Sequence, residues 1–120
     1  MSQFNPVILA SQTITATTVG TVQSPTPVKW GQIIVNVTAR TSGSITPHIQ
    51  GYDPASGSWY DILVGAAISS VSQTILYVGP AFTVTSNVSA NAFLPTYWRV
   101  QLVTASSTNL VASVGAQLAP

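Results

Sequence analysis

Hydrophobic and polar residues alternate along much of the chain, and the alternation is clearest over residues 33–40. Ile33, Val35, Val37 and Ala39 hold the odd positions of this segment, whereas the even positions include Asn, Thr and Arg. Side chains of a β-strand point alternately to the two faces of its sheet. The pattern therefore predicts a strand whose odd positions point into a core.

Similar segments recur at short intervals, separated by clusters of Gly, Pro, Ser and Asn. Thr, Val and Ile favour strands, because β-branched side chains pack well on a pleated sheet. We expect an all-β fold, an antiparallel β-sandwich or jelly-roll-like barrel of about eight strands. Besides residues 33–40, the expected strands are residues 12–19, 45–51, 59–64, 74–78, 82–88, 97–104 and 110–118.

Two of the connections between these segments carry specific expectations. Residues 53–58 predict the tip of a hairpin, because proline after aspartate suits a turn and Gly57 can adopt a positive φ. Residues 97–104 and 110–118 are expected to pair with each other across a short turn. The tripeptide Val-Thr-Ala occurs twice, each time before a Ser/Thr turn and a further strand, which indicates two similar hairpins.

The start of the chain follows a different pattern. Residues 1–11 contain the apolar Phe4, Pro6 and Ile8 but show no clean two-residue period. We expect this segment to be an extended N-terminal arm that needs a surface to lie on. Residues 12–120 are expected to form a single β-sandwich domain.

Charged residues are rare in this chain of 120 residues. Asp, Glu, Lys and Arg make up 4% of it, whereas an ordinary globular chain carries about 25%. Disorder does not explain the composition, because 46% of the residues are hydrophobic. Surfaces of soluble monomers normally carry interspersed charges, and the centres of protein interfaces are depleted in them. We therefore expect the domain to pack against copies of itself or against a partner.

The composition also argues against several kinds of partner. The net charge of +1 provides no electrostatic footprint for nucleic acid or for an anionic membrane. The longest apolar run, residues 62–68, is far shorter than the roughly 20 residues of a membrane-spanning helix. The first six residues lack the basic and apolar regions of a secretory signal, so export by that route is not expected. The absence of cysteine excludes disulfides and thiolate sites.

Candidate catalytic residues are few. His48 is the only histidine, so any Ser-His-Asp triad would have to include it, and no nucleophile-elbow glycine pattern surrounds a serine. Asp53 and Asp61 are the only carboxylate side chains, and they fall in a turn and a strand. Calcium needs more acidic oxygens than these, and no phosphate-binding glycine motif is present. We expect no enzymatic activity, no cofactor and no metal.

The aromatic residues admit two interpretations. Trp59 and Tyr60 are adjacent in an expected strand, so they point to opposite faces. Packing in the core or at a subunit interface is favoured, because aromatic side chains dominate the energetics of both. A stacking platform for sugars is the alternative. Arg99 is expected either to pair with Asp61 across strands or to cap an interface.

Four short segments resemble small virion proteins of tailed bacteriophages. The resemblance covers about two-thirds of the chain and rests on structural motifs. The segments are Val-x-Val-Thr-Ala at residues 35–39, His-Ile-Gln-Gly-Tyr-Asp-Pro-Ala-Ser-Gly-Ser-Trp-Tyr-Asp at residues 48–61, Leu-Pro-x-x-Trp-Arg-Val at residues 94–100 and Ser-Val-Gly-Ala at residues 113–116.

The resemblance implies a capsid decoration (cement) protein on the exterior of the virion, made in the host cytoplasm. Such proteins bridge capsid subunits, often as homotrimers, so the implied partners are the major capsid protein and the chain itself. A tail or fibre module that binds host-surface glycans is the alternative. For a decoration protein, we expect residues 1–11 and one sheet edge to make the capsid contacts, so deleting residues 2–10 should abolish capsid binding and leave the fold intact. The residues expected at a capsid or subunit interface are Phe4, Pro6, Val7, Ile8, Trp59 and Arg99.

Overall fold

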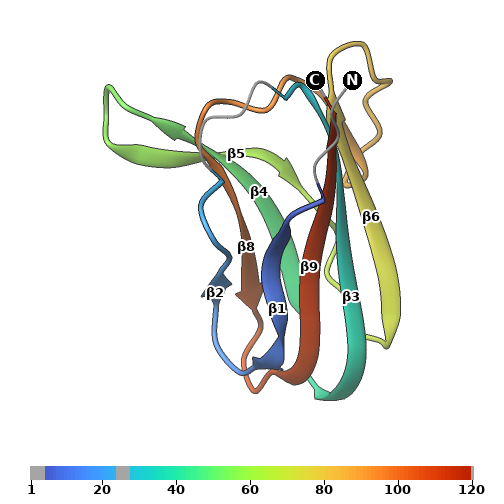
Figure 1. Ribbon diagram of the computed structural model, residues 1–120. Helices are drawn as coiled ribbons and strands as arrows, with labels where there is room; N and C mark the ends of the chain where they lie inside the picture. The colour runs from blue at the N-terminus through green and yellow to red at the C-terminus, as the bar shows by residue number, and fades with distance from the viewer. Residues whose placement is uncertain (1–4, 24–27, 120) are drawn as a thin grey trace.

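A computed structural model describes residues 5–23 and 28–119 and shows two β-sheets packed face to face (Figure 1). The first sheet has five strands and the second has four. The five strands of the first sheet are, in spatial order, β1 (Val7–Ile14), β9 (Asn109–Ala119), β3 (Trp30–Ser42), β6 (Ser72–Gly79) and β7 (Ser89–Asn91). The four strands of the second are β2 (Thr18–Val19), β8 (Trp98–Thr104), β4 (Ile45–Asp53) and β5 (Ser58–Val64).

The strand order is that of a jelly roll. Without β7, the sheets read β1-β9-β3-β6 and β2-β8-β4-β5, so the chain crosses repeatedly from one sheet to the other. All strand pairs are antiparallel except β6 with β7. The expected all-β sandwich is confirmed, with nine strands in the described part of the chain where about eight were predicted.

The core lies between the sheets and follows the alternation of the sequence. Ile33, Val35 and Val37 are buried as predicted, whereas Ala39 is exposed because a register shift between β3 and β9 follows Val37. The largest side chain in the core is Trp98, which is 2% exposed. Further fully buried side chains come from both sheets: Ile8, Ile14, Ile45, Ile49, Leu76, Leu102, Leu110 and Val78.

The expected N-terminal arm is wrong for residues 7–11. These residues belong to β1, which pairs with β9, and Ile8 and Leu9 are buried. Register shifts in this pairing disturb the two-residue period of buried positions, which is why the sequence pattern did not predict a strand at residues 7–11. Deleting residues 2–10 would therefore remove part of the core, and the deletion cannot test an arm alone.

The predicted pairing of residues 97–104 with residues 110–118 is also wrong. The corresponding strands β8 and β9 lie in different sheets, and both contribute side chains to the core. The Ser/Thr turn after β3 likewise crosses between sheets, so neither Val-Thr-Ala segment belongs to a hairpin. A period of two residues identifies the buried face of a strand but not its neighbour in the sheet.

The strand predicted at residues 82–88 is replaced by irregular turns. The ring of Phe82 stacks edge-on against Trp30, with 5.2 Å between the centroids. Asn87 has a φ of 63°, and the Ser89 hydroxyl accepts a hydrogen bond from the Thr85 amide and donates one to the Thr83 carbonyl. These local bonds take the place of a strand ladder.

Candidate binding surface

Aromatic side chains gather in one half of the sandwich. Every Trp, Tyr and Phe of residues 5–23 and 28–119 belongs to the start of β3 or β8, the end of β4 or β6, the start of β5, or the connection from β6 to β8. These segments lie in the half of the sandwich that carries the β4–β5 hairpin (Figure 1). The connections at the opposite end are residues 15–17, 43–44, 65–71 and 105–108, and they contain no aromatic or charged residue. The two ends therefore offer very different surfaces to a partner.

A polar network occupies the outer face of the four-stranded sheet, and Gln50 of β4 is its centre. Gln50 is 8% exposed, and its amide nitrogen donates to Asp61 Oδ1 at 3.1 Å and to Gln101 Oε1 at 3.2 Å. Its amide oxygen accepts a hydrogen bond of 2.8 Å from Arg99 Nε. His48 Nδ1 lies 3.1 Å from the same Asp61 oxygen. Alternation along β4 and β8 places His48, Gln50, Arg99 and Gln101 on one face. A register shift in the β4–β5 pairing after Ile49 sets Asp61 opposite Gln50 and so brings it to the same face.

Arg99 was expected to pair with Asp61 or to cap an interface. In the structure it reaches Asp61 only through Gln50, and its guanidinium carbon lies 4.2 Å from the centroid of the Trp59 ring. A cation over an aromatic face is attracted by the quadrupole of the ring. Burial lowers the pKa of the Arg99 guanidinium. Tyr52 packs beside Trp59, with 5.1 Å between the ring centroids, so Trp59 is fixed from two directions.

Two adjoining hollows lie next to this network, and Tyr52 and Tyr97 line both of them. Val22 and Trp59 complete the first hollow, which has a volume of ≈ 220 Å³. The second hollow has a volume of ≈ 360 Å³. A backbone hydrogen bond of 3.1 Å from the Tyr52 amide to the Tyr97 carbonyl joins the segments that carry the two tyrosines. The second hollow is also lined by Pro54, Phe93, Pro95 and Thr96.

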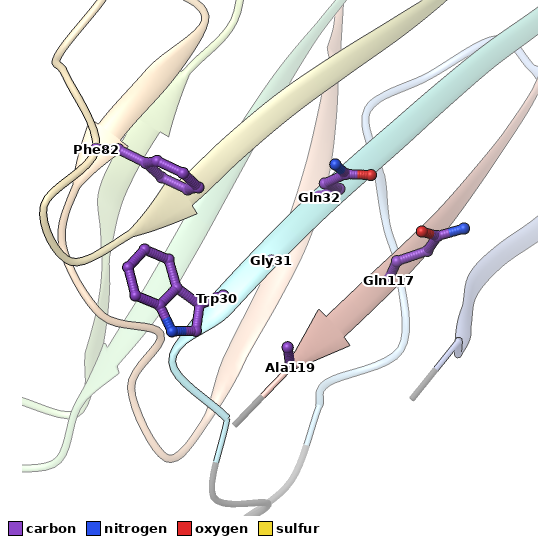
Figure 2. Close-up of a pocket in the computed structure, with 6 residues that line it drawn as sticks. All are labelled: Trp30, Gly31, Gln32, Phe82, Gln117 and Ala119. Atoms are coloured by element: carbon purple, nitrogen blue, oxygen red, sulfur yellow. The ribbon is translucent and has the colours of Figure 1, made fainter. Parts of the chain in front are cut away.

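A third hollow, on the outer face of the five-stranded sheet, has a volume of ≈ 190 Å³. Figure 2 shows the Trp30 and Phe82 rings on one side of it and the Gln32 and Gln117 amides along the neighbouring strands. Gln32 and Gln117 are cross-strand partners of β3 and β9. This hollow is smaller than the other two and has no ordered polar network of its own among the residues that line it.

The structure brings together only some of the residues predicted for an interface. Trp59 and Arg99 are in contact and half-buried on the outer face of the four-stranded sheet. Val7 is 71% exposed at the start of β1, whereas Ile8 is 1% exposed and belongs to the core. Pro6 is half-buried, and its carbonyl accepts a hydrogen bond from Ala116. Phe4 lies outside the described residues.

Gln50, Gln101 and Phe93 were not predicted from the sequence. The alternation of the sequence could have indicated the two glutamines, because they occupy outward positions in strands that also carry His48 and Arg99. Phe93 is 66% exposed in the connection between β7 and β8, where no periodicity predicts orientation.

The two acidic residues lie apart in the structure, with Asp61 beside His48 and Asp53 at the hairpin tip. In the described ranges, the hydrogen bonds of His48 include no serine or threonine hydroxyl, and no group of three or more His, Asp or Glu side chains is close enough to hold a metal. Asp53 caps the hairpin tip, where bonds from the Ser56 hydroxyl and the Ala55 amide lower the pKa of its carboxyl group. Gly57 has a φ of 69°, as predicted.

Comparisons with protein-family models, with curated proteins and with solved structures gave no match. Among residues 5–23 and 28–119, no helix is long and apolar enough to cross a membrane. The fold and the surface geometry therefore carry the functional interpretation.

Replacing Gln50 tests whether the polar network stabilises the sheet. We expect Gln50→Leu to lower the free energy of unfolding by about 1–2 kcal/mol, because Arg99, Asp61 and Gln101 lose a fixed partner but can still reach water. Urea unfolding followed by tryptophan fluorescence measures the change. Gln32→Leu is the matched control, since Gln32 is exposed on the other sheet, and its effect should stay within about 0.5 kcal/mol.

Proposed function

We propose that this protein is a structural component of a virion, a decoration protein that docks on an assembled capsid and on copies of itself as a homotrimer. The observation that carries the proposal is the scarcity of charge on the five-stranded sheet. Within the described residues, its strands contain one charged side chain, Arg40, which lies near the end of β3 and donates to the Gly43 carbonyl. Viral capsid domains are among the proteins that use the jelly-roll fold, although the fold alone does not define a function.

The outer face of this sheet has the composition of an interface. Ile34 and Ile75 are half-buried cross-strand partners at its centre, surrounded by amide and hydroxyl side chains. Gly115, the partner of Ile34 in β9, leaves open space where a side chain would stand. The centres of protein interfaces are depleted in Lys, Glu and Asp, because desolvating an unpaired charge is costly. A protein that binds only the assembled lattice stabilises that lattice by mass action.

A charge introduced on this face tests the proposal. We expect the wild-type protein to elute at the mass of a trimer of the 12.5 kDa chain and to bind capsids purified without it. Gly115→Glu should weaken capsid binding at least about tenfold, because a carboxylate would be buried against the partner. Co-sedimentation with capsids measures binding, and light scattering after size exclusion measures mass.

Ala66→Glu is the matched control, since it adds the same charge on an exposed connection at the far end of the sandwich. Its capsid binding should equal that of the wild-type protein. A strictly monomeric protein that is absent from purified particles would refute the proposal. If Gly115→Glu and the wild-type protein bound capsids equally, the outer face of the five-stranded sheet would not be the capsid-binding surface.

A further inference from the structure

We propose a second binding site, independent of capsid docking, for an uncharged oligosaccharide at the hairpin end of the four-stranded sheet, beside the polar network on its outer face. The site combines the two hollows at Tyr52 and Tyr97 with the polar network around Gln50. It lies on a different sheet from Gly115, so the two surfaces can be tested separately.

The aromatic part of the site is ready to stack on sugar rings. Tyr97 is 44% exposed, and Tyr52 forms a common wall of both hollows with it. Trp59 contacts both Tyr52 and the Arg99 guanidinium, so its ring is oriented before any ligand arrives. Rigid aromatic side chains offer large contact areas at low entropic cost. The two adjoining hollows can each accommodate one of two successive sugar units of an oligosaccharide.

The polar part supplies donors and acceptors in fixed positions. Gln50 is almost fully buried and orients Arg99, Asp61 and Gln101 through its three hydrogen bonds. A guanidinium has five N–H donors, and one of those of Arg99 serves Gln50, which leaves others for a ligand. Asp61 Oδ1 accepts from Gln50, whereas Oδ2 is a further acceptor. Hydroxyl groups donate and accept, so a polyhydroxylated ligand satisfies both kinds of partner.

The charge and polarity of the site indicate which class of ligand it can bind. Arg99 and Asp61 are opposite in sign and coupled through Gln50, so with His48 neutral the network has no net charge to attract an ionic ligand. A purely apolar peptide would cover these polar groups without pairing them, which costs free energy for each group left unpaired. A proline-rich peptide would use the aromatic hollows but not the network. An uncharged saccharide has apolar C–H faces that can pack on the aromatic hollows and hydroxyl groups that can bond to the polar network.

Titration of the purified protein with defined oligosaccharides tests the site. The probes are cellohexaose, chitohexaose, maltohexaose and mannohexaose, followed by an array of bacterial surface glycans, with decaproline as the peptide probe. We expect at least one saccharide to shift the amide signals of Tyr52, Trp59 and Gln101 in NMR spectra. Tyr97→Ala should raise the dissociation constant at least about tenfold, because the common wall of both hollows is lost.

Tyr60→Ala is the matched control, because Tyr60 is 47% exposed on the same strand as Trp59 but lines neither hollow. It should bind the saccharide within about twofold of wild type. Saccharide binding that survives Tyr97→Ala, binding of decaproline alone, or no binding to any glycan would each overturn the proposal. Capsid binding by Tyr97→Ala should be unchanged, so failure of this site is distinguishable from failure of the decoration role.

Discussion

Trp98→Ala is expected to lower the free energy of unfolding by about 3–5 kcal/mol, because it empties the largest side-chain site of the core. Trp98 is 2% exposed and begins β8, where it faces the five-stranded sheet. Domains of this size are stabilised by about 5–15 kcal/mol, so the loss removes a large part of the total. The melting temperature should fall by about 12–20 °C.

Thermal unfolding followed by circular dichroism measures this effect. Tyr97→Ala is the control, because Tyr97 is the preceding residue and is 44% exposed, and it should change stability by less than about 1 kcal/mol. Equal destabilisation by the two variants would contradict the assignment of Trp98 to the core.

Gly43→Ala is expected to lower the free energy of unfolding by about 3 kcal/mol, since two costs add. Gly43 has a φ of 77°, a conformation that a residue with a Cβ atom adopts only at a cost of about 1–2 kcal/mol. A Cβ atom would also overlap the Cα and Oγ1 atoms of Thr108. Thr108 is buried, and its hydroxyl lies within hydrogen-bond distance of the Ala105 and Ser44 carbonyls, at 2.7 and 3.1 Å, which ties together the two turns that cross between the sheets.

Gly57→Ala separates the two costs. Gly57 has a φ of 69° at the hairpin tip, but the nearest atom to an added Cβ is the Tyr52 hydroxyl at 3.9 Å. This variant should lose only about 1 kcal/mol, from backbone strain alone. Denaturant unfolding of both variants gives the difference, and equal losses would show that the contact with Thr108 costs nothing.

The Thr108 contact also explains why two segments that look like hairpins are not. Ser42 Oγ donates to the Ser107 carbonyl, and the Ala105 amide donates to the Ser44 carbonyl. The turn after β3 and the turn after β8 therefore lie side by side and bond to each other. Their similar Val-Thr-Ala starts reflect similar positions in the jelly roll, where each turn joins one sheet to the other.

The candidate surfaces could be predicted only in part. The scarcity of charge and the outward position of Trp59 or Tyr60 were visible in the sequence, and they led to the expectation of an interface. The central role of Gln50 was not visible, because its partners come from β5 and β8, which lie 11 and 49 residues away from it along the chain. The hollows at Tyr97 depend on irregular connections, for which no periodicity exists.

The sequence by itself determined the all-β class, the inward face of most strands and the hairpin at residues 53–58, because alternation and turn chemistry are local properties. The tertiary structure decided which strands are neighbours, that residues 7–11 belong to the sheet, and that Arg99, Gln50 and Asp61 meet on one face. Strand pairing joins residues far apart in the chain, and its energy comes from the packing of a whole core between two sheets. A two-residue period of hydrophobic positions does not indicate which distant strand will pack or pair with a given segment.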